Sequence, residues 1–341
     1  KAYQENILDT VAIQSRRIVS GMRPTGQLHL GHYHGVLKNW IKLQHEFDCF
    51  FFVADWHALS SLYEDPSRIK EYSFDLAVDW LSAGLDPDKS TIFVQSEIPE
   101  HAELHMILSM IVPVPWLERN PTYKEKRDEI KNVDINSYGF LGYPVLQTAD
   151  IVLYKADYVP VGIDQAPHLE ISREIVRRFH KLYKKKVFIE PEAKISDIPK
   201  LSGLDGRKMS KTYNNAIFLS DSEKEIAKKV QSMLTDPARA RRDDPGNPDV
   251  CNLYPFHKIY SPQTMQDEID ADCRTAKIGC GDCKKMLTQT MLEGMRPMRE
   301  KREAILARPG DVKEILREGT LKAHAVAKST LEQAKQAMKL T

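Results

Sequence analysis

Two short stretches carry residue types that could bind a polyphosphate. In the first, SGMRPTGQLHLGHYHG at 20–35, His29 and His32 stand at the entry of an expected helix, among three glycines. Glycine lets a backbone approach a phosphate closely, and a helix N-terminus directs unpaired N–H groups at an anion. Two imidazoles can add hydrogen-bond donors. This stretch therefore predicts a cradle for the phosphates of a nucleotide.

Two other interpretations of the first stretch remain. Ordinary turn residues with surface histidines would also produce it. A zinc site at His29, His32 and His34 lacks a cysteine or carboxylate close by in the sequence, and it would leave Gly21 and Gly26 unexplained.

The second stretch, GRKMSKTYNN at 206–215, places Lys208 and Lys211 on either side of Met209 and Ser210. Two lysines three positions apart on a polar loop can close on the outer phosphates of ATP and stabilise a leaving pyrophosphate. Alone, the motif would be interpreted as a solvated basic loop.

A third stretch, 139–165, could recognise a ring that carries a hydrogen-bond donor. If residues 143–153 are helical, Tyr143, Gln147 and Asp150 share one face. Asp150 could accept a hydrogen bond from an indole N–H or equally from a phenol. A core-facing helix with a paired aspartate is the structural alternative.

Four of the five cysteines form the pattern C-x21-C-x6-C-x2-C. An odd cysteine count in a chain of 341 residues favours a reducing intracellular compartment over disulfides. Structural zinc sites usually use two close ligand pairs, and this pattern has only one. All-cysteine ligation also suits an iron–sulfur cluster, so spacing alone leaves both metals open. The four cysteines are Cys251, Cys273, Cys280 and Cys283.

The composition is that of an ordinary globular protein, with 42% hydrophobic and 28% charged residues. With a net charge of +1, a nucleic-acid partner would have to be held by local patches. The longest apolar run, around residue 50, is too short to span a bilayer, so we expect no membrane partner.

Strand-like and helix-like segments alternate after a short N-terminal extension at 1–15. Strands are expected at 16–21, 48–56 and 90–96, and helices at 30–47 and 67–84. This alternation predicts an α/β fold with a Rossmann-like, doubly wound parallel sheet, whose ligands lie beyond the carboxyl ends of the strands.

From about residue 214 helical periodicity takes over, clearest at 221–234 and 319–338, with a loop at 236–249. We therefore expect a Rossmann-like domain over 16–213 and a helical domain over 214–341.

The motifs together resemble a known enzyme class. HLGH is similar to the His-Ile-Gly-His signature of class I aminoacyl-tRNA synthetases. KMSKT resembles the Lys-Met-Ser-Lys-Ser loop of the same class, in the expected order, and Thr212 keeps the final hydroxyl. YPVLQTADI and VPVGIDQ look like the substrate segments of tryptophanyl-tRNA synthetases, and the similarity spans most of the chain.

This resemblance implies a tryptophan-tRNA ligase with a Rossmann-like catalytic domain and a helical anticodon-binding domain. Such an enzyme joins L-tryptophan to ATP with Mg²⁺, releases pyrophosphate, and transfers the amino acid to tRNA(Trp). The implied catalytic residues are His29, His32, Lys208 and Lys211. The implied ATP-binding residues are Arg23, Pro24, Thr25, Gly31, His32, Gly162, Asp164, Lys208, Met209, Ser210 and Lys211. The implied tryptophan-binding residues are Tyr143, Gln147, Asp150 and Gln165.

Two positions depart from the pattern of many relatives, because many bacterial members have Gln in place of Arg23 and several have Met in place of Gln147. The four cysteines are similar to a motif that a subset of these enzymes uses to bind a 4Fe–4S cluster, with Zn²⁺ as the alternative. The resemblance also implies a cytoplasmic homodimer. Basic residues at 177–186, 239–242 and 296–302 are candidates for contacts with tRNA.

Three other functions compete with this hypothesis. A tyrosine-specific synthetase is the nearest. A small-molecule adenylyltransferase would share HLGH but would not need the lysine loop followed by a helical domain. A non-catalytic, synthetase-like paralogue that binds RNA or senses redox state would have no use for both signatures.

Overall fold

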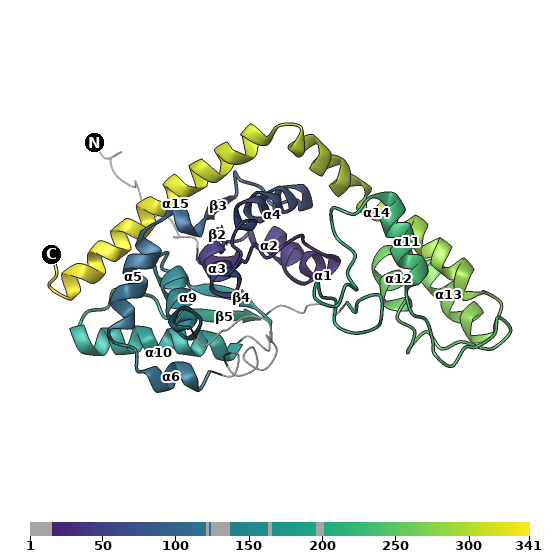
Figure 1. Cartoon of the computed structure of the whole chain (residues 1–341), viewed down its shortest axis with the longest axis horizontal. Helices are drawn as coiled ribbons and strands as arrows, with labels where there is room; N and C mark the ends of the chain where they lie inside the picture. Colours follow the sequence, from purple (N-terminus) through teal and green to yellow (C-terminus); the bar gives the residue numbers. More distant parts are fainter. Residues whose placement is uncertain (1–15, 121–122, 124–136, 163–165, 196–200) are drawn as a thin grey trace, which may run out of the picture.

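The computed structural model describes residues 16–120, 123, 137–162, 166–195 and 201–341. They form a five-stranded sheet with helices on both faces and a group of helices to one side (Figure 1). The strands are β1 (Arg17–Met22), β2 (Asp48–Val53), β3 (Ser90–Val94), β4 (Tyr158–Val161) and β5 (Glu192–Ile195). The predicted α/β class with a Rossmann-like parallel sheet is confirmed.

All strand pairs in the sheet are parallel, in the order β3-β2-β1-β4-β5. The direction of winding reverses between β1 and β4. In open parallel sheets a ligand crevice forms at this point, beyond the carboxyl ends of the strands.

The central strands are buried on both faces. Along β2, Phe51 and Val53 belong to one hydrophobic core, whereas Phe50 and Phe52 belong to another. Because side chains alternate along a strand, a strand covered on both sides has an uninterrupted apolar sequence. The strand expected at 48–56 therefore forms, but it ends at Val53, and α3 (Asp55–Leu62) follows.

One face of the sheet carries the expected first helix and α4 (Ile69–Ala83). The first helix is broken into α1 (Leu30–His32), a π-helical turn η1 (Tyr33–Leu37) and α2 (Lys38–Leu43). Single π-helical turns often occur at functional sites, and periodicity did not predict this one. Gly84 ends α4 with a φ of 116°, as expected of a glycine cap.

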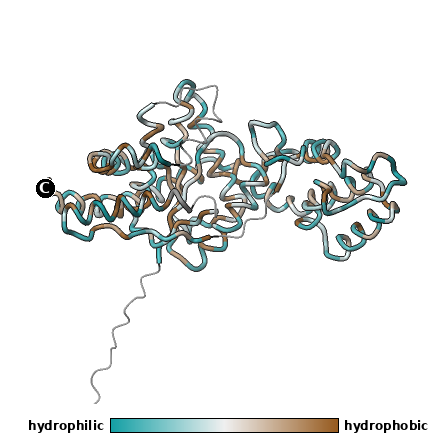
Figure 2. Tube along the Cα trace, turned by 90° about the horizontal axis from the view of Figure 1, so that it is seen from below, coloured by the Kyte–Doolittle hydropathy of each residue, from teal (hydrophilic) through white to brown (hydrophobic). Residues whose placement is uncertain are grey.

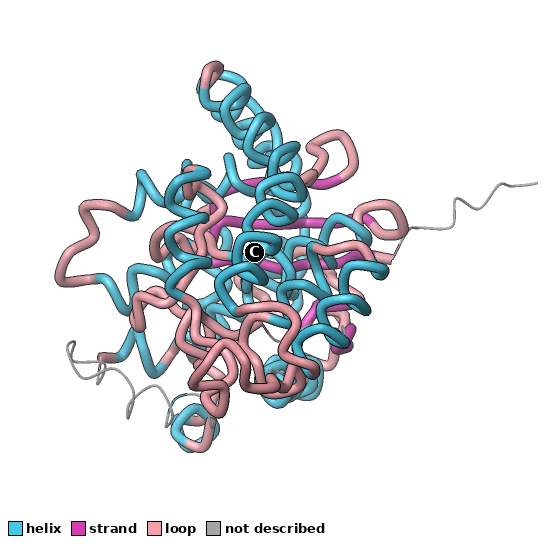
Figure 3. The backbone as a smooth tube through the Cα atoms, turned by 90° about the vertical axis from the view of Figure 1, so that its right-hand side faces the viewer, coloured by secondary structure: helices cyan, strands magenta, loops and turns pink. Residues whose placement is uncertain are grey.

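The other face is covered by α5 (Glu100–Ser109), α9 (Tyr143–Val152) and α10 (Ala166–Tyr183). Figure 3 shows the helices in cyan and the loops between them in pink. Several short helical elements lie between the longer helices and strands along the chain. They are α3 (Asp55–Leu62), η2 (Gln95–Glu97), α6 (Val114–Glu118) and α8 (Tyr138–Leu141).

A group of helices lies to one side of the sheet: α11 (Glu223–Ser232), α12 (Tyr254–Tyr260), α13 (Gln263–Arg274) and α14 (Cys280–Leu306). The loop expected at 236–249 contains no helix or strand. In Figure 2, brown (hydrophobic) and teal (hydrophilic) stretches alternate along the trace.

The last helix, α15 (Pro309–Ala337), returns to the sheet and packs on β3 and α5. A Cβ atom at Gly319 would overlap the carbonyl oxygen of Ile92, so only glycine lets the helix approach the edge strand this closely. Further along, Ala323 and Ala327 are fully buried in the sheet core. The domain division at residue 213 stays a prediction, and α15 packs on the sheet side of it.

No helix in the described part of the chain is both long and apolar enough to cross a membrane.

Candidate active site

A cavity of about 400 Å³ lies where the winding of the sheet reverses. Its wall comes from the carboxyl ends of β1 and β4 and from α3 and α9. Gly21 in β1 belongs to this wall, and a Cβ there would come within 2.5 Å of the Phe52 ring. The predicted site residues that line the cavity are Arg23, His32, Tyr143, Gln147, Asp150 and Gly162.

Helix α9 presents Tyr143, Gln147 and Asp150 to the cavity from one face, so the predicted geometry of this segment is confirmed. The Tyr143 hydroxyl accepts a hydrogen bond from the Asn120 side-chain amide at 3.2 Å. The ring of Tyr143 also lies edge-on to His57, with ring centroids 6.5 Å apart. An aromatic wall therefore stands beside the carboxylate.

Asp150 is fully buried and holds three hydrogen bonds. Oδ1 accepts from Gln95 Nε2 at 2.7 Å and from His101 Nδ1 at 2.6 Å, and Oδ2 accepts from His57 Nε2 at 2.7 Å. Burial alone would raise the pKa of Asp150, but His57 and His101 together hold that pKa below its usual range. Each carboxylate oxygen has two lone pairs, so Oδ2 can accept from one more donor in the cavity.

A further hydrogen bond extends this network behind Asp150. His101 Nε2 lies 2.6 Å from the Tyr154 hydroxyl. A carboxylate only accepts, so His101 Nδ1 carries the proton and its Nε2 can accept from Tyr154. Burial raises the pKa of Tyr154 well above its ordinary value, which keeps the phenol protonated. The network thus holds Asp150 in one position.

Sequence reasoning assigned no role to Gln95, His57 or His101. A signal for two of them was available: Gln95 directly follows β3, and His57 lies four residues beyond β2. Both therefore stand at the carboxyl edge of the sheet, where ligand-binding side chains gather. His101 belongs to α5 and carries no comparable signal.

His29 and His32 lie against each other at the start of α1, with ring centroids 3.8 Å apart. Burial, with Lys211 nearby, lowers the pKa of His29 to about 4. Burial, His29 and Lys211 lower the pKa of His32 to about 2. Both imidazoles are therefore neutral at pH 7. A Cβ at Gly31 would lie 3.0 Å from the His29 ring, so glycine makes room for this pair.

One nitrogen of this histidine pair lacks a hydrogen-bond partner among the described residues. Within the described ranges, Nδ1 of His29 is buried without a hydrogen-bond partner. Buried polar atoms of this kind are rare in proteins and often mark a place where a ligand or water binds.

The lysine loop is tied to the histidine segment. Lys211 Nζ donates to the carbonyl oxygen of Gly26 at 2.9 Å. The amide of Leu30 donates to Ile217 and that of Leu219 to Leu28, both at 2.9 Å. The two signatures, far apart in the sequence, are therefore joined by backbone hydrogen bonds.

The surroundings of Lys211 disfavour the charged form of its amine. Burial and the nearby Arg23 lower the pKa of Lys211 to about 8, and Asp79 partly offsets this effect. Met209, in the same loop, is buried, and its Cβ lies 3.8 Å from the position a Cβ would take at Gly31.

Asn215 fixes the shape of the lysine loop. Its buried side chain accepts from the Ser210 amide at 2.8 Å and donates to the Lys208 carbonyl at 3.2 Å and to Asp205 at 2.7 Å. The Lys208 side chain is exposed and has no recorded contact with the histidine pair among the described residues.

The remaining predicted residues lie at the mouth of the cavity or outside the described ranges. Arg23 is exposed, and its Nη1 lies 3.5 Å from Ser61 Oγ. Pro24 is buried beside it, and the Thr25 amide donates to the Arg23 carbonyl. Asp164 and Gln165 lie outside the described residues.

The four cysteines gather at the far end of the helical group. Arg239 Nη1 lies 3.9 Å from both the Cys273 and the Cys280 sulfur, and Cys283 Sγ lies 3.3 Å from His257 Nε2. Burial, together with the other three cysteines of the cluster, raises the pKa of Cys283 to about 12. Among the described residues, no three His, Cys, Asp or Glu side chains are arranged to hold a metal ion.

Several basic residues proposed for tRNA contacts are already paired. Arg177 bonds Glu170 and Glu190, and Arg239 points at sulfurs rather than solvent. Arg299 pairs with Glu223, and Arg302 with Asp79. These side chains are therefore poorer candidates for phosphate contacts than the sequence indicated.

Comparison with known proteins shows to which family the chain belongs. Residues 14–294 match the family of tRNA synthetases class I (W and Y). The chain is 52% identical over 326 residues to a tryptophan–tRNA ligase of Thermotoga maritima, covering 95% of this chain and 99% of that protein. It is 41% identical over 394 aligned residues to the tryptophan–tRNA ligase of Aquifex aeolicus, covering 95% and 100%.

A solved structure agrees with these relatives. The tryptophanyl-tRNA synthetase of Campylobacter jejuni, complexed with ADP and tryptophan, superimposes with a TM-score of 0.87 at 34% identity, over 95% of this chain and 99% of that one. The cavity, the paired signatures and these similarities lead to one conclusion: the chain belongs to the class I tRNA synthetases of the tryptophan and tyrosine group.

Proposed function

We propose that this protein is a tryptophan–tRNA ligase. It activates L-tryptophan with ATP to give tryptophanyl-adenylate and pyrophosphate, and it transfers the amino acid to the 3′ end of tRNA(Trp). Two relatives with this function are 52% and 41% identical over nearly the whole chain. The observation that carries the proposal furthest is the buried Asp150 carboxylate at the cavity wall, within reach of a ring N–H.

The cavity would hold the amino acid as follows. The indole N–H donates to Asp150 Oδ2, which keeps a free lone pair beside its bond from His57. Tyr143 and Gln147 line the same wall, and Gln165 completes the proposed tryptophan-binding set. Because Asp150 is ionised, it binds a donor at the ring more strongly than a neutral acceptor would.

The first chemical step needs no general base from the protein. An α-carboxyl group has a pKa of about 3.5, so the attacking carboxylate is already ionised at pH 7. Catalysis would then consist of positioning and of charge stabilisation on the phosphates. Mg²⁺ arrives with ATP as part of the substrate and neutralises part of the phosphate charge.

We assign the phosphate-binding role to both signatures. The neutral His29 and His32 donate hydrogen bonds, whereas Lys211, protonated below about pH 8, supplies a full charge. Lys208, exposed on the same loop, would swing in when ATP binds. The further ATP contacts that we propose are Arg23, Pro24, Thr25, Gly31, Gly162, Asp164, Met209 and Ser210.

One assay tests the proposal against its competitors. ATP–pyrophosphate exchange is measured with tryptophan, with tyrosine and without an amino acid. We expect exchange that depends on tryptophan. Exchange that depends on tyrosine would reassign the substrate, and no exchange with either would favour the non-catalytic paralogue. Charging of tRNA(Trp) transcripts then tests the second step.

We also propose that the four cysteines bind a 4Fe–4S cluster, with Zn²⁺ as the alternative. The ligand chemistry supports this proposal, because the four thiols act electrostatically on one another and Arg239 directs an N–H at two of the sulfurs. In the described residues the four side chains would still have to turn toward one point to bind the cluster. A cluster bound there would cross-link the loop before α12 to α13 and α14, far from the cavity.

The metal content of anaerobically purified protein tests this assignment. We expect broad visible absorption that is lost in Cys280→Ser and kept in the control Cys49→Ala, because Cys49 is buried in the sheet core. Colourless protein with stoichiometric zinc would overturn the iron–sulfur assignment.

We further propose a cytoplasmic homodimer with a catalytic domain at 16–213, an anticodon-binding domain at 214–341 and an N-terminal extension at 1–15. Exposed apolar side chains support the dimer, since Met106, Met110 and Val114 extend from α5 and α6. The molar mass in solution should fall from dimer to monomer in Met110→Lys. An unchanged mass would exclude this surface.

A further inference from the structure

A hydrogen bond joins the histidine segment (residues 29–37) to the helical group. His34 lies in the π-helical turn η1, and its Nε2 is 2.9 Å from the hydroxyl oxygen of Tyr260 in α12. The two rings meet edge to face, with centroids 5.6 Å apart. His34 is only 5% exposed, and a buried imidazole nitrogen needs such a partner. The proposed chemistry uses neither side chain directly.

The Tyr260 ring is fixed from the side of the helical group. A Cβ atom at Gly294 in α14 would lie 3.1 Å from Cδ1 of the Tyr260 ring, so glycine lets the ring pack directly on α14. Directly after Tyr260, Ser261 Oγ lies 2.7 Å from His257 Nδ1 and 3.2 Å from Thr290 Oγ1 of α14. Helix α12 is therefore anchored to α14, and Tyr260 follows any movement of the helical group.

The backbone connects His34 closely to the histidine pair. The amides of His32 and Tyr33 donate to the His29 carbonyl at 2.8 and 3.2 Å, and the Lys38 amide closes the π-helical turn on the Tyr33 carbonyl. Single turns of this kind are rare and often mark functional sites. A shift of the His34 side chain therefore moves the turn that carries the His32 ring.

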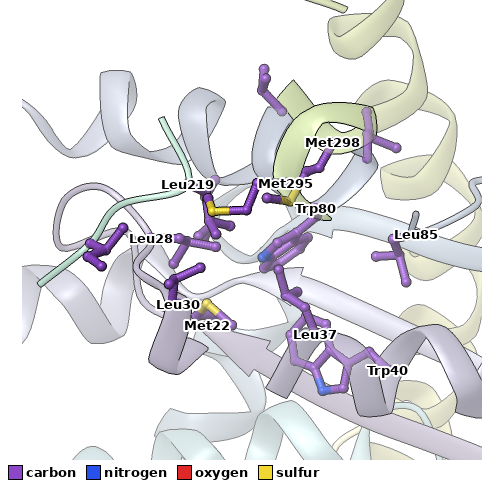
Figure 4. Close-up of a cluster of buried hydrophobic side chains, with 14 of the residues drawn as sticks. Met22, Leu28, Leu30, Leu37, Trp40, Trp80, Leu85, Leu219, Met295 and Met298 are labelled. Atoms are coloured by element: carbon purple, nitrogen blue, oxygen red, sulfur yellow. The ribbon is translucent and has the colours of Figure 1, made fainter. Parts of the chain in front are cut away.

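Apolar packing defines this arrangement less sharply than the hydrogen bond does. Leu30 and Leu37, in α1 and η1, lie in the same core as Met295 of α14 (Figure 4). Apolar contacts have no preferred direction, and packed helices can slide slightly past one another. A hydrogen bond depends on both distance and angle. The bond between His34 and Tyr260 thus determines where the histidine segment lies against α12.

The bond does not depend on a charge. Burial raises the pKa of Tyr260 above its ordinary value, and burial with Lys38 nearby lowers the pKa of His34 to about 3. Both groups are therefore neutral at pH 7, and the contact persists across the neutral range.

We propose that His34 and Tyr260 are positioning residues for the adenylation reaction, which hold the His29–His32 pair in place relative to the helical group. This inference rests on the proposed function. The proposed indole-binding residue Asp150 comes from α9, which packs on the other face of the sheet. Loss of the bond should therefore slow catalysis without weakening tryptophan binding.

Tyr260→Phe is the first test. It removes the hydroxyl and keeps the ring that packs on Gly294, so the variant should remain folded, as circular dichroism and thermal unfolding would show. In tryptophan-dependent ATP–pyrophosphate exchange with full-length protein, kcat should fall roughly tenfold, because His34 is left buried without its partner. KM for tryptophan should stay within about twofold.

Tyr254→Phe is the matched control. Tyr254 lies in the same helix, and its hydroxyl donates to the Gln266 carbonyl oxygen at 3.2 Å inside the helical group. The same atom is removed from the same type of residue without touching the histidine segment. This variant should keep the wild-type kcat.

A double-mutant cycle assigns the effect to the bond itself. His34→Leu should lower kcat about as much as Tyr260→Phe, and the double variant should be no slower than the slower single variant. Multiplied losses in the double variant would show that the two side chains act independently, and they would overturn the inference.

Amide hydrogen exchange supplies a readout that needs no activity. Exchange in η1, above all at the Lys38 amide that closes the turn, should become faster in Tyr260→Phe but not in Tyr254→Phe. If the wild-type protein lacks exchange activity, the proposed function fails, while this measurement still decides whether the bond holds η1 in place.

Two further outcomes would count against the proposal. An unchanged kcat in folded Tyr260→Phe would leave His34 an ordinary buried histidine with a satisfied nitrogen. An equal loss of kcat in Tyr254→Phe would show a general effect of loosening α12.

Discussion

The two halves of the candidate site are built in opposite ways. The Asp150 side is complete within the protein, with three donors on one buried carboxylate and a tyrosine behind it. The phosphate side is incomplete: His29 keeps a buried nitrogen without a described partner, and Lys211 is partly deprived of solvent beside Arg23. The Asp150 side is held in one position and is suited to selecting a ring. The unsatisfied groups of His29 and Lys211 are instead stabilised most when a negatively charged ligand binds beside them.

This difference has an energetic reason. A buried carboxylate that already has its partners costs nothing to reorganise when the ring binds. In the proposed reaction, donors that lack partners in the free protein would instead be satisfied by the phosphates, and most fully where negative charge develops on the leaving pyrophosphate. The following substitutions test whether changes in the phosphate side lower mainly kcat, whereas changes in the Asp150 side raise mainly KM for tryptophan.

Lys211→Ala should produce the largest change. It removes the charge that acts electrostatically on both histidines, so we expect kcat for exchange to fall about 10²- to 10³-fold while KM for tryptophan stays within about twofold. Steady-state exchange kinetics measure both parameters. Equal losses of rate and tryptophan affinity would contradict the division into two halves.

Asp150→Asn should act on the other half. The amide keeps the shape but loses the charge and must turn a donor toward His57, His101 or Gln95. We expect kcat/KM for tryptophan to fall about hundredfold, mostly through KM, with KM for ATP unchanged. A variant that binds tryptophan normally would show that the carboxylate serves only the core.

Asn215→Ala should have a moderate effect. It deletes the amide that holds Ser210 and the Lys208 carbonyl, so the loop loses its shape while its lysines remain. We expect kcat to fall about tenfold. The neighbouring control Asn214→Gly, at an exposed position with a φ of 49°, should be close to wild type in the same assay. Similar losses in both variants would point to the loop backbone instead.

The smallest effect should appear in the pH profile. The pKa of Lys211 is about 8, so the charged form prevails below pH 8 and is lost as the pH rises further. kcat/KM for ATP should therefore fall above about pH 8. In Lys211→Arg this decline should move to higher pH, because a guanidinium stays charged. The histidines, with pKa values of about 4 and 2, should contribute no limb near neutrality.

The features of the fold that depend on residues close together in the sequence could be predicted. The apolar run at 48–56 indicated a buried strand, which forms over Asp48–Val53, and Gly84 indicated a helix end. The face of α9 followed from spacing alone, because helical periodicity fixes which side chains share a side.

Features in which residues from distant parts of the sequence meet in space could not be predicted. His57, Gln95 and His101 reach Asp150 from three separate elements, and nothing in the spacing between them encodes that meeting. The π-helical turn at Tyr33–Leu37 likewise lacks a periodic signature, since it depends on how the histidine segment packs. Tertiary contacts decide such features, so local sequence cannot.

Helix α15 has a consequence for synthesis of the protein. It covers β3, the edge strand of the sheet, and Gly319 is the point of closest approach. Strand β3 leaves the ribosome long before α15, so during translation this edge of the nascent sheet is uncovered and able to pair with strands of other chains. Its protection depends on a helix encoded much later in the sequence than β3, so chains cut off before α15 should be more prone to aggregation than their folded content suggests.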